Sequence, residues 1–161
     1  MGAISDDIRD LLLLLNRHGV EYAICGGHAV AFHGYSRLTM DVDVLIKPSP
    51  ENARRLAAAL GEFGFGHAGI PFGAFAVEGT AVSLGVQPNQ IDLLTSMSSQ
   101  STREVFAHLV EGHLAGVPVR IVSADDLLRA KHEAGRPKDL VDAAELAQAA
   151  ARRAREDKPS D

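Results

Sequence analysis

The stretch from residue 37 to residue 46, RLTMDVDVLI, alternates apolar and polar residues, and this period of two predicts a β-strand. Its apolar face would carry Leu38, Met40, Val42 and Val44. Its polar face would carry Arg37, Thr39, Asp41 and Asp43. Carboxylates that lie side by side on a strand repel one another, and strands are depleted in Asp. A divalent cation that bridges Asp41 and Asp43 is the simplest way to make this arrangement favourable.

The composition fits a soluble globular protein. At 161 residues the chain can form one domain that buries roughly 70% of its unfolded surface. Apolar residues make up 46% and charged residues 23% of the chain, which are ordinary values for such a domain. The net charge of -5 argues against broad, nonspecific coating of nucleic acid, but it leaves open a local basic site for an RNA end.

The cysteine count and the apolar runs bear on location. A single cysteine, Cys25, excludes an intramolecular disulfide and fits a reducing compartment. The apolar run from Leu11 to Leu15 is too short to cross a bilayer and fits the buried stripe of a helix. We therefore expect a cytoplasmic protein with no membrane partner.

Capping residues and hydrophobic periodicity predict mixed helices and strands. The expected helices cover residues 6–17, 28–33, 50–60, 102–109, 124–131 and 137–147. The expected strands cover residues 21–25, 37–46, 74–77, 81–84, 90–95, the surroundings of 113, and 117–122. The predicted fold class is α/β (α+β), with a small mixed β-sheet flanked by helices and with C-terminal helices. Residues 1–150 would form a single domain, and the charged tail 151–161 is expected to fray from Arg152.

Two further features are candidates for chemistry. Gly26 and Gly27 lie between an expected strand and an expected helix, where glycines let backbone N–H groups approach a phosphate. The alternative is an ordinary tight turn. Asp92 is flanked by Ile91 and Leu93 on an otherwise apolar strand, and its alternative is a place at an exposed sheet edge.

The order of these features resembles the DNA polymerase beta-like nucleotidyltransferase superfamily. The resemblance rests on a Gly-Gly turn into a helix, then an R-x-T-x-D-x-D strand, then a single Asp on a later strand. Lys131 and the run RPKDLVD at 136–142 are similar to the small nucleotidyltransferases related to abortive-infection, type IV toxin–antitoxin toxins. The resemblance extends from Leu11 to about Leu146 and implies the nucleotidyltransferase fold.

The resemblance also implies a metal-dependent reaction. Asp41 and Asp43 would hold two Mg²⁺ ions, for which Mn²⁺ can substitute, and Asp92 would hold only the ion that activates the attacking hydroxyl and could act as the base. Gly26 and Gly27 would cradle the β- and γ-phosphates of a nucleoside triphosphate (NTP) such as ATP. The enzyme would transfer a nucleoside monophosphate to a hydroxyl and release pyrophosphate.

The sequence leaves the acceptor and the partners open. The acceptor could be RNA, such as the 3′ end of tRNA, a protein side chain, or a small molecule such as an aminoglycoside; the resemblance to toxins favours RNA. The alternative function is a catalytically silent module of the same fold that binds a partner protein, such as an antitoxin. The oligomeric state is not indicated.

Lysines and acids near the C-terminus are further candidate site residues. The resemblance makes Lys131 and Asp139 part of the active site, with Lys131 on the triphosphate. The alternative for Lys131 is a lysine that extends from a buried stripe to solvent. Lys138 is a weaker candidate of the same kind, and Asp139 also suits the first turn of a helix without any function.

Polar residues around the two glycines complete the predicted site. Arg37 would contact a phosphate or pair with Asp41 or Thr39, and Thr39 would orient Asp41 through its hydroxyl. The wider superfamily usually has Ser where this chain has Gly27, so a hydroxyl contact is lost, and His28 is the candidate that would replace it as a donor.

Overall fold

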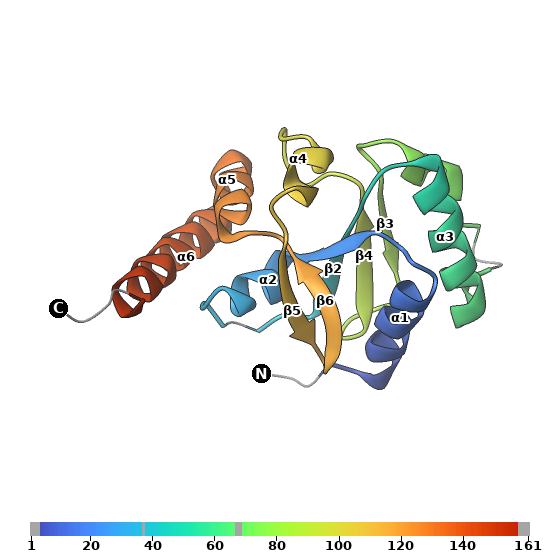
Figure 1. The fold of residues 1–161 in the computed structure, drawn as a ribbon, viewed down its shortest axis with the longest axis horizontal. Coiled ribbons are helices and arrows are strands. Elements are labelled where there is room, and N and C mark those ends of the chain that lie inside the picture. Colours follow the sequence, from blue (N-terminus) through green and yellow to red (C-terminus); the bar gives the residue numbers. More distant parts are fainter. Residues whose placement is uncertain (1–3, 37, 67–68, 158–161) are drawn as a thin grey trace.

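The computed structural model describes residues 4–36, 38–66 and 69–157, and these residues form one mixed α/β unit (Figure 1). Its strands are β1 (Tyr22–Cys25), β2 (Asp41–Ile46), β3 (Ala81–Leu84), β4 (Gln90–Leu94), β5 (Val110–Leu114) and β6 (Val117–Ile121). Its α-helices are α1 (Asp6–Arg17), α2 (Gly26–Phe32), α3 (Pro50–Leu60), α4 (Thr102–Phe106), α5 (Ala124–Ala134) and α6 (Pro137–Glu156). A π-helical turn, η1 (Gly61–Phe65), and a 3₁₀ helix, η2 (Phe72–Ala76), lie between α3 and β3.

Within the described ranges, six strands form one sheet in the order β3-β4-β2-β1-β6-β5. The pairs β1–β2, β3–β4 and β5–β6 are antiparallel, whereas β1–β6 and β2–β4 are parallel. All four residues of β1 are buried, as expected of a strand at the centre of a sheet that is covered on both faces. The parallel pairing of β2 with β4 brings together two strands that lie far apart in the sequence. The predicted mixed sheet with flanking helices is therefore confirmed.

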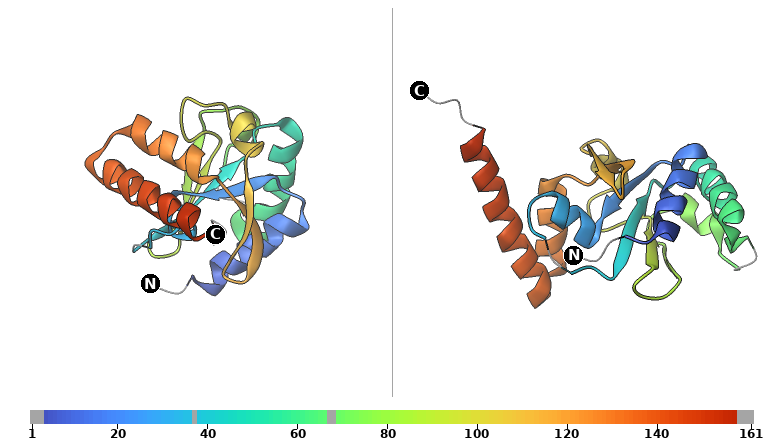
Figure 2. Two further views of the ribbon diagram at one scale, coloured as in Figure 1. Left: turned by 60° about the vertical axis from the view of Figure 1, so that its left-hand side comes forward. Right: turned by 90° about the horizontal axis from the view of Figure 1, so that it is seen from below.

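The helices form two groups at opposite ends of the molecule (Figures 1 and 2). Helix α1 lies beside α3, and its leucine stripe is buried, as the apolar run predicted. The Ser5 hydroxyl oxygen accepts the N–H of Ile8 at 3.3 Å and so caps α1. At the other end α5 packs on α6, and Gly135, with φ of +65°, makes the sharp turn between them.

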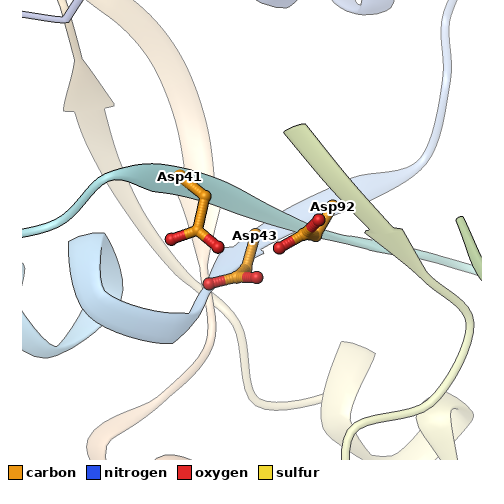
Figure 3. A group of neighbouring side chains, drawn as sticks. All are labelled: Asp41, Asp43 and Asp92. Carbon is orange, nitrogen blue, oxygen red and sulfur yellow. The ribbon is translucent and has the colours of Figure 1, made fainter. Parts of the chain in front are cut away.

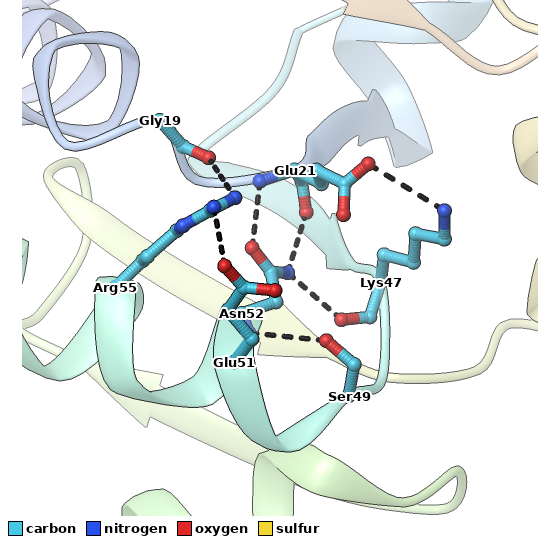
Figure 4. Close-up of polar contacts among 7 residues, drawn as sticks. All are labelled: Gly19, Glu21, Lys47, Ser49, Glu51, Asn52 and Arg55. Carbon is cyan, nitrogen blue, oxygen red and sulfur yellow. Dashed lines mark hydrogen bonds and ion pairs between the residues drawn. The ribbon is translucent and has the colours of Figure 1, made fainter.

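Asn52 on α3 joins the start of β1 to the end of β2 (Figure 4). Its side-chain amide donates to the carbonyl oxygens of Glu21 at 2.9 Å and of Lys47 at 2.8 Å, and its Oδ1 accepts the N–H of Glu21 at 2.8 Å. The Ser49 hydroxyl caps the same helix by accepting the Asn52 N–H at 3.0 Å. Only 1% of Asn52 is exposed, so these three side-chain bonds satisfy a buried amide and fix α3 across the two central strands.

The strand that carries the Asp pair is shorter than predicted. It begins at Asp41, where ladder pairing with Gln90 begins, and not at residue 37. Leu38 and Met40 were predicted to be on a buried face, but they are 69% and 39% exposed because the segment before Asp41 has no neighbouring strand to cover it. Arg37 lies outside the described residues.

Other element boundaries also differ from the predictions. The strand predicted at 74–77 is wrong: η2 occupies this region, where the Ala74 carbonyl accepts the Thr80 hydroxyl at 2.7 Å and the Phe75 ring is fully buried. Helix α4 ends at Phe106, before the predicted limit of 109. Helix α6 continues to Glu156, so the part of the charged tail from Arg152 to Glu156 is helical rather than frayed. Among the described residues, no helix combines the length and the apolar character needed to span a bilayer.

We predict that Asn52→Ala lowers the free energy of unfolding by about 2–4 kcal/mol, because it leaves buried backbone groups of Glu21 and Lys47 without partners. Urea denaturation measures this change. Arg55→Ala on the same helix is the matched control, since Arg55 is exposed and pairs with Glu51 at the surface; it should cost less than about 1 kcal/mol. Equal losses in the two variants would show that the Asn52 amide has no special part in the fold.

Candidate active site

Three aspartates from two neighbouring strands converge on one point. Asp43 of β2 is directly opposite Asp92 of β4 in the parallel ladder, and Asp41 lies two residues earlier on the same face of β2. The three side chains point toward one another (Figure 3), and one carboxylate oxygen from each lies within 4.8 Å of the others. The predicted convergence of Asp41, Asp43 and Asp92 is therefore present in the structure. Asp92 does not lie at an exposed edge of the sheet, because β3 pairs with β4 on its outer side.

Asp43 is the least favourably charged of the group. Burial raises its pKa to about 7, and the negative charges of Asp41 and Asp92 add to the effect, whereas Lys131 opposes it. A hydrogen bond between Asp43 and Asp92 acts in the same upward direction. At neutral pH the metal-free site therefore holds more negative charge than its surroundings stabilise, which is the condition that a divalent cation relieves.

Asp92 differs from Asp43 in its hydrogen-bond partners. Partial burial acts to raise the pKa of Asp92, but hydrogen bonds from Ser83 and Gln90 outweigh it and hold the pKa below its usual value. The Ser83 hydroxyl donates to Asp92 Oδ1 at 2.6 Å, and Gln90 Nε2 donates to the same oxygen at 2.9 Å. Asp92 is thus the carboxylate that stays ionised, and both donors fix the direction of its side chain.

The two glycines are placed directly against this group. Helix α2 begins at Gly26, so both glycines belong to its first turn rather than to a preceding loop as predicted. Gly26 has a φ of +64°, and a Cβ there would overlap the carboxylate of Asp43. A Cβ on Gly27 would lie 2.5 Å from the Thr39 hydroxyl oxygen. Only glycine fits both positions without moving Asp43 or Thr39, which is a stronger reason for the Gly-Gly pair than a tight turn.

A cavity of about 440 Å³ opens beside the aspartates. One end is lined by Gly26, Gly27, Thr39, Asp41 and Asp43. The other end is lined by residues of α5, of α6 and of the turn between them, among them Lys131, Arg136, Lys138 and Asp139. The cavity therefore joins a cluster of carboxylates to a group of cations, as a site for a metal-bound polyphosphate requires.

Cys25 and His28 have no evident part in this chemistry. Cys25 lines the cavity floor, but burial and the nearby Asp43 raise the pKa of its thiol, so it stays protonated at neutral pH. His28, the candidate replacement donor, is not among the residues that line the cavity.

Lys131 is held between two buried carboxylates of α6. Its side chain is 13% exposed, and its ammonium nitrogen lies 3.5 Å from Asp139 Oδ1 and 3.1 Å from Asp142 Oδ2. It therefore does not extend to solvent from the buried stripe, which was the alternative reading. Its charge also reaches the Asp43 carboxyl, whose pKa it lowers.

Arg136 fixes Asp139 from the other side. Arg136 Nε donates to Asp139 Oδ2 at 2.6 Å and its Nη2 donates to Oδ1 at 3.3 Å, a bidentate pair. The hydrogen bond from Arg136, together with the charge of Lys131, holds the pKa of Asp139 below its usual value in spite of burial. Sequence reasoning named Lys131, Lys138 and Asp139 but did not include Arg136 or Asp142, although both belong to the RPKDLVD run.

Comparisons with known proteins give a fold. No protein-family model and no curated protein matches the chain. A solution structure of the antibiotic-resistance factor ANT(2'')-Ia matches with a TM-score of 0.53 and 17% identity, over 93% of this chain and 91% of that one. A crystal structure of ANT(2'')-Ia in complex with adenylyl-2''-tobramycin matches with a TM-score of 0.53 and 17% identity, over 92% of this chain and 96% of that one. An antigenic nucleotidyltransferase-like protein from Paracoccidioides brasiliensis matches with a TM-score of 0.50 and 19% identity, over 89% of this chain and 77% of that one. The chain therefore has the nucleotidyltransferase fold.

The pKa of Asp43 gives a stability prediction for the metal-free protein. Because the folded-state pKa of about 7 lies above the usual 3.8, the native state binds the extra proton, and stability falls as pH rises through that window. Asp43→Asn removes the charge and should raise the free energy of unfolding at about pH 8 by about 1–3 kcal/mol, less than the shift would give in full because the site is partly solvated. The gain should shrink at about pH 5.

Urea denaturation in the presence of a chelator measures both values. Glu111→Gln is the control, since Glu111 is exposed on β5, away from the site, and its variant should show little change at either pH. A gain that is the same at both pH values would contradict the electrostatic cause.

Proposed function

We propose that this protein is a metal-dependent nucleotidyltransferase, which moves a nucleoside monophosphate from an NTP to a hydroxyl acceptor and releases pyrophosphate. The observation that carries the proposal is the convergence of Asp41, Asp43 and Asp92 at one end of a cavity whose other end holds Lys131 and Arg136. A structural metal site would need the carboxylates but not the cations beside them. The nucleotidyltransferase fold agrees with this reading, although at 17% identity it does not by itself show an activity.

The donor set fits divalent magnesium or manganese. Asp41, Asp43 and Asp92 offer hard oxygen ligands, and the raised pKa of Asp43 marks a place where a cation is favoured. The ions would neutralise the triphosphate and make the acceptor hydroxyl a better nucleophile. Asp41 and Asp43 would hold two ions, and Asp92 would hold only the one on the acceptor side.

The remaining residues then have defined tasks. Gly26 and Gly27 leave room for the triphosphate next to Asp43, and Lys131 places a fixed positive charge across the cavity from it. Asp139 is proposed to keep Lys131 in place, and Lys138 to contact a phosphate from the cavity rim. Thr39 would support the turn of α2 at Gly27, and Arg37 stays a candidate phosphate contact.

The reaction itself is an in-line displacement. The acceptor oxygen forms a bond to the α-phosphorus, and the bond from that phosphorus to the oxygen bridging to the β-phosphate breaks. Asp92, the ionised carboxylate of the group, accepts the hydroxyl proton, and pyrophosphate leaves with the electron pair of the broken bond.

The acceptor is proposed to be RNA, such as a tRNA 3′ end, or a small cationic sugar. The toxin-like sequence pattern favours RNA, and a toxin of this kind would be silenced by an antitoxin protein. The adenylyl-tobramycin bound to ANT(2'')-Ia and the net charge of -5 favour the sugar. A silent module that only binds a partner is the alternative function, but a module without chemistry has no need for three carboxylates that repel one another.

Transfer of radiolabel tests the proposal. We expect label from one or more α-³²P NTPs, with Mg²⁺ or Mn²⁺, to move to RNA, to an aminoglycoside or to a protein in separate reactions, whereas γ-³²P is released as pyrophosphate. Asp43→Ala should reduce the transfer at least about 100-fold, and Glu111→Gln should leave it unchanged. Transfer of γ-label would indicate a kinase instead. The absence of transfer from every NTP to every acceptor, in a wild-type protein that is folded, would contradict the proposal and favour the silent module.

A further inference from the structure

The cavity has a third wall that the proposed chemistry does not use. The loop after β4 contributes Ser96, Met97 and Ser98, and α5 contributes Ala130 and Ala134. Unlike the two ends of the cavity, this wall carries no charged side chain. It is apolar in its middle and has a hydroxyl on each side of Met97, so it suits a neutral group that is apolar on its face and polar at its edge.

The loop is tied to α5 by a carboxylate clamp. Glu133 Oε1 accepts the backbone N–H of Ser99 at 2.7 Å, and Glu133 Oε2 accepts the Ser99 hydroxyl at 2.9 Å. Both oxygens of one side chain thus hold one loop residue, directly after the residues that line the cavity. Ser99 is exposed, so its own packing does not fix the loop, and the clamp is what joins this part of the loop to the helix.

The serine hydroxyls are oriented by the backbone. Ser96 Oγ accepts the N–H of Gly79 at 3.1 Å, and Ser98 Oγ accepts the N–H of Gln100 at 3.2 Å. Each oxygen is held on the side of its acceptor lone pairs, so the O–H can donate toward the cavity that both residues line.

The place of this wall relative to Lys131 identifies its ligand. Leu127, Lys131 and Ala134 are four and three residues apart on α5 and follow one face of the helix, and all three line the cavity. A triphosphate that reaches Lys131 therefore has the apolar residues of the same helix face next to it. In an NTP, the group attached to the triphosphate is the nucleoside, which is neutral. Both proposed acceptors carry charge, so the uncharged wall suits the nucleoside better.

We propose that the Ser96–Ser98 loop and the cavity face of α5 form the subsite for the nucleoside of the NTP, and that Glu133 is a positioning residue that holds this subsite closed. The inference rests on the proposed function, because it assumes that an NTP occupies the cavity. Hydroxyls donate and accept equally well, and none of the residues lining the cavity is aromatic. The subsite therefore binds all four bases, with affinities within about tenfold of one another.

The test compares each NTP with inorganic tripolyphosphate, which carries the same phosphates without a nucleoside. Calorimetry in Mn²⁺ should show that wild-type protein binds an NTP at least about tenfold more tightly than tripolyphosphate. Glu133→Gln and Met97→Ala should each reduce this ratio about threefold to tenfold, with tripolyphosphate affinity unchanged. Glu111→Gln is the matched control and should keep the wild-type ratio.

Hydrogen exchange gives a second readout that does not depend on binding. The Ser99 amide should exchange faster in Glu133→Gln than in wild type, because its acceptor is weakened, whereas the amides of β4 should not change. A wild-type ratio near one would overturn the subsite while leaving the triphosphate site intact. Variants that change acceptor affinity but not the ratio would overturn it too, since the wall would then hold the acceptor. If wild-type protein binds neither probe, the proposed function itself fails.

Discussion

Mutual repulsion among three carboxylates is the interaction around which this site is organised. Asp41, Asp43 and Asp92 are brought together by the parallel pairing of β2 with β4, and nothing within the metal-free group offsets all of their charge. The sheet tolerates this because β2 lies between β1 and β4, where backbone pairing on both sides fixes its direction. The fold thus supplies the stability and the site consumes part of it, as is common where strain serves a ligand.

The surroundings of the group are shaped for the same purpose. Glycine at 26 and 27 allows the first turn of α2 to approach the carboxylates closely. Cations are kept on the far side of the cavity by α5 and α6, where the buried acids of α6 hold Lys131 and Arg136 holds Asp139. The cations therefore face the carboxylates across the space that a triphosphate would fill, rather than neutralising them by direct pairing.

Much of the fold and part of the site could be predicted from the sequence, because they depend on local patterns. The alternation around Asp41 and Asp43 fixes a shared face whatever the partner strand is, and serine caps mark where helices begin. Lys131 on an apolar stripe signalled a buried partner before that partner was known. The adjacency of Asp92 came from the family resemblance and not from any local signal.

What could not be predicted depends on pairing between distant segments. Ser83 orients Asp92 only because β3 pairs with β4 in one register, and Glu133 reaches Ser99 only because α5 lies beside the loop. The exposure of Leu38 has the same origin in reverse, since its alternation was right for a strand but no neighbouring strand covers it. Arg136 was overlooked because a bidentate pair with Asp139 requires the turn at Gly135, whose geometry the sequence alone does not give.

The most direct measurement of the central claim is a titration of the nucleotide-free protein with Mn²⁺, followed by electron paramagnetic resonance. If the three carboxylates form a metal site, wild-type protein binds Mn²⁺ saturably, Mg²⁺ competes for the same site, and Asp92→Asn weakens the affinity at least about tenfold. Binding that is unsaturable, or that is equally strong in Asp92→Asn, would contradict the account.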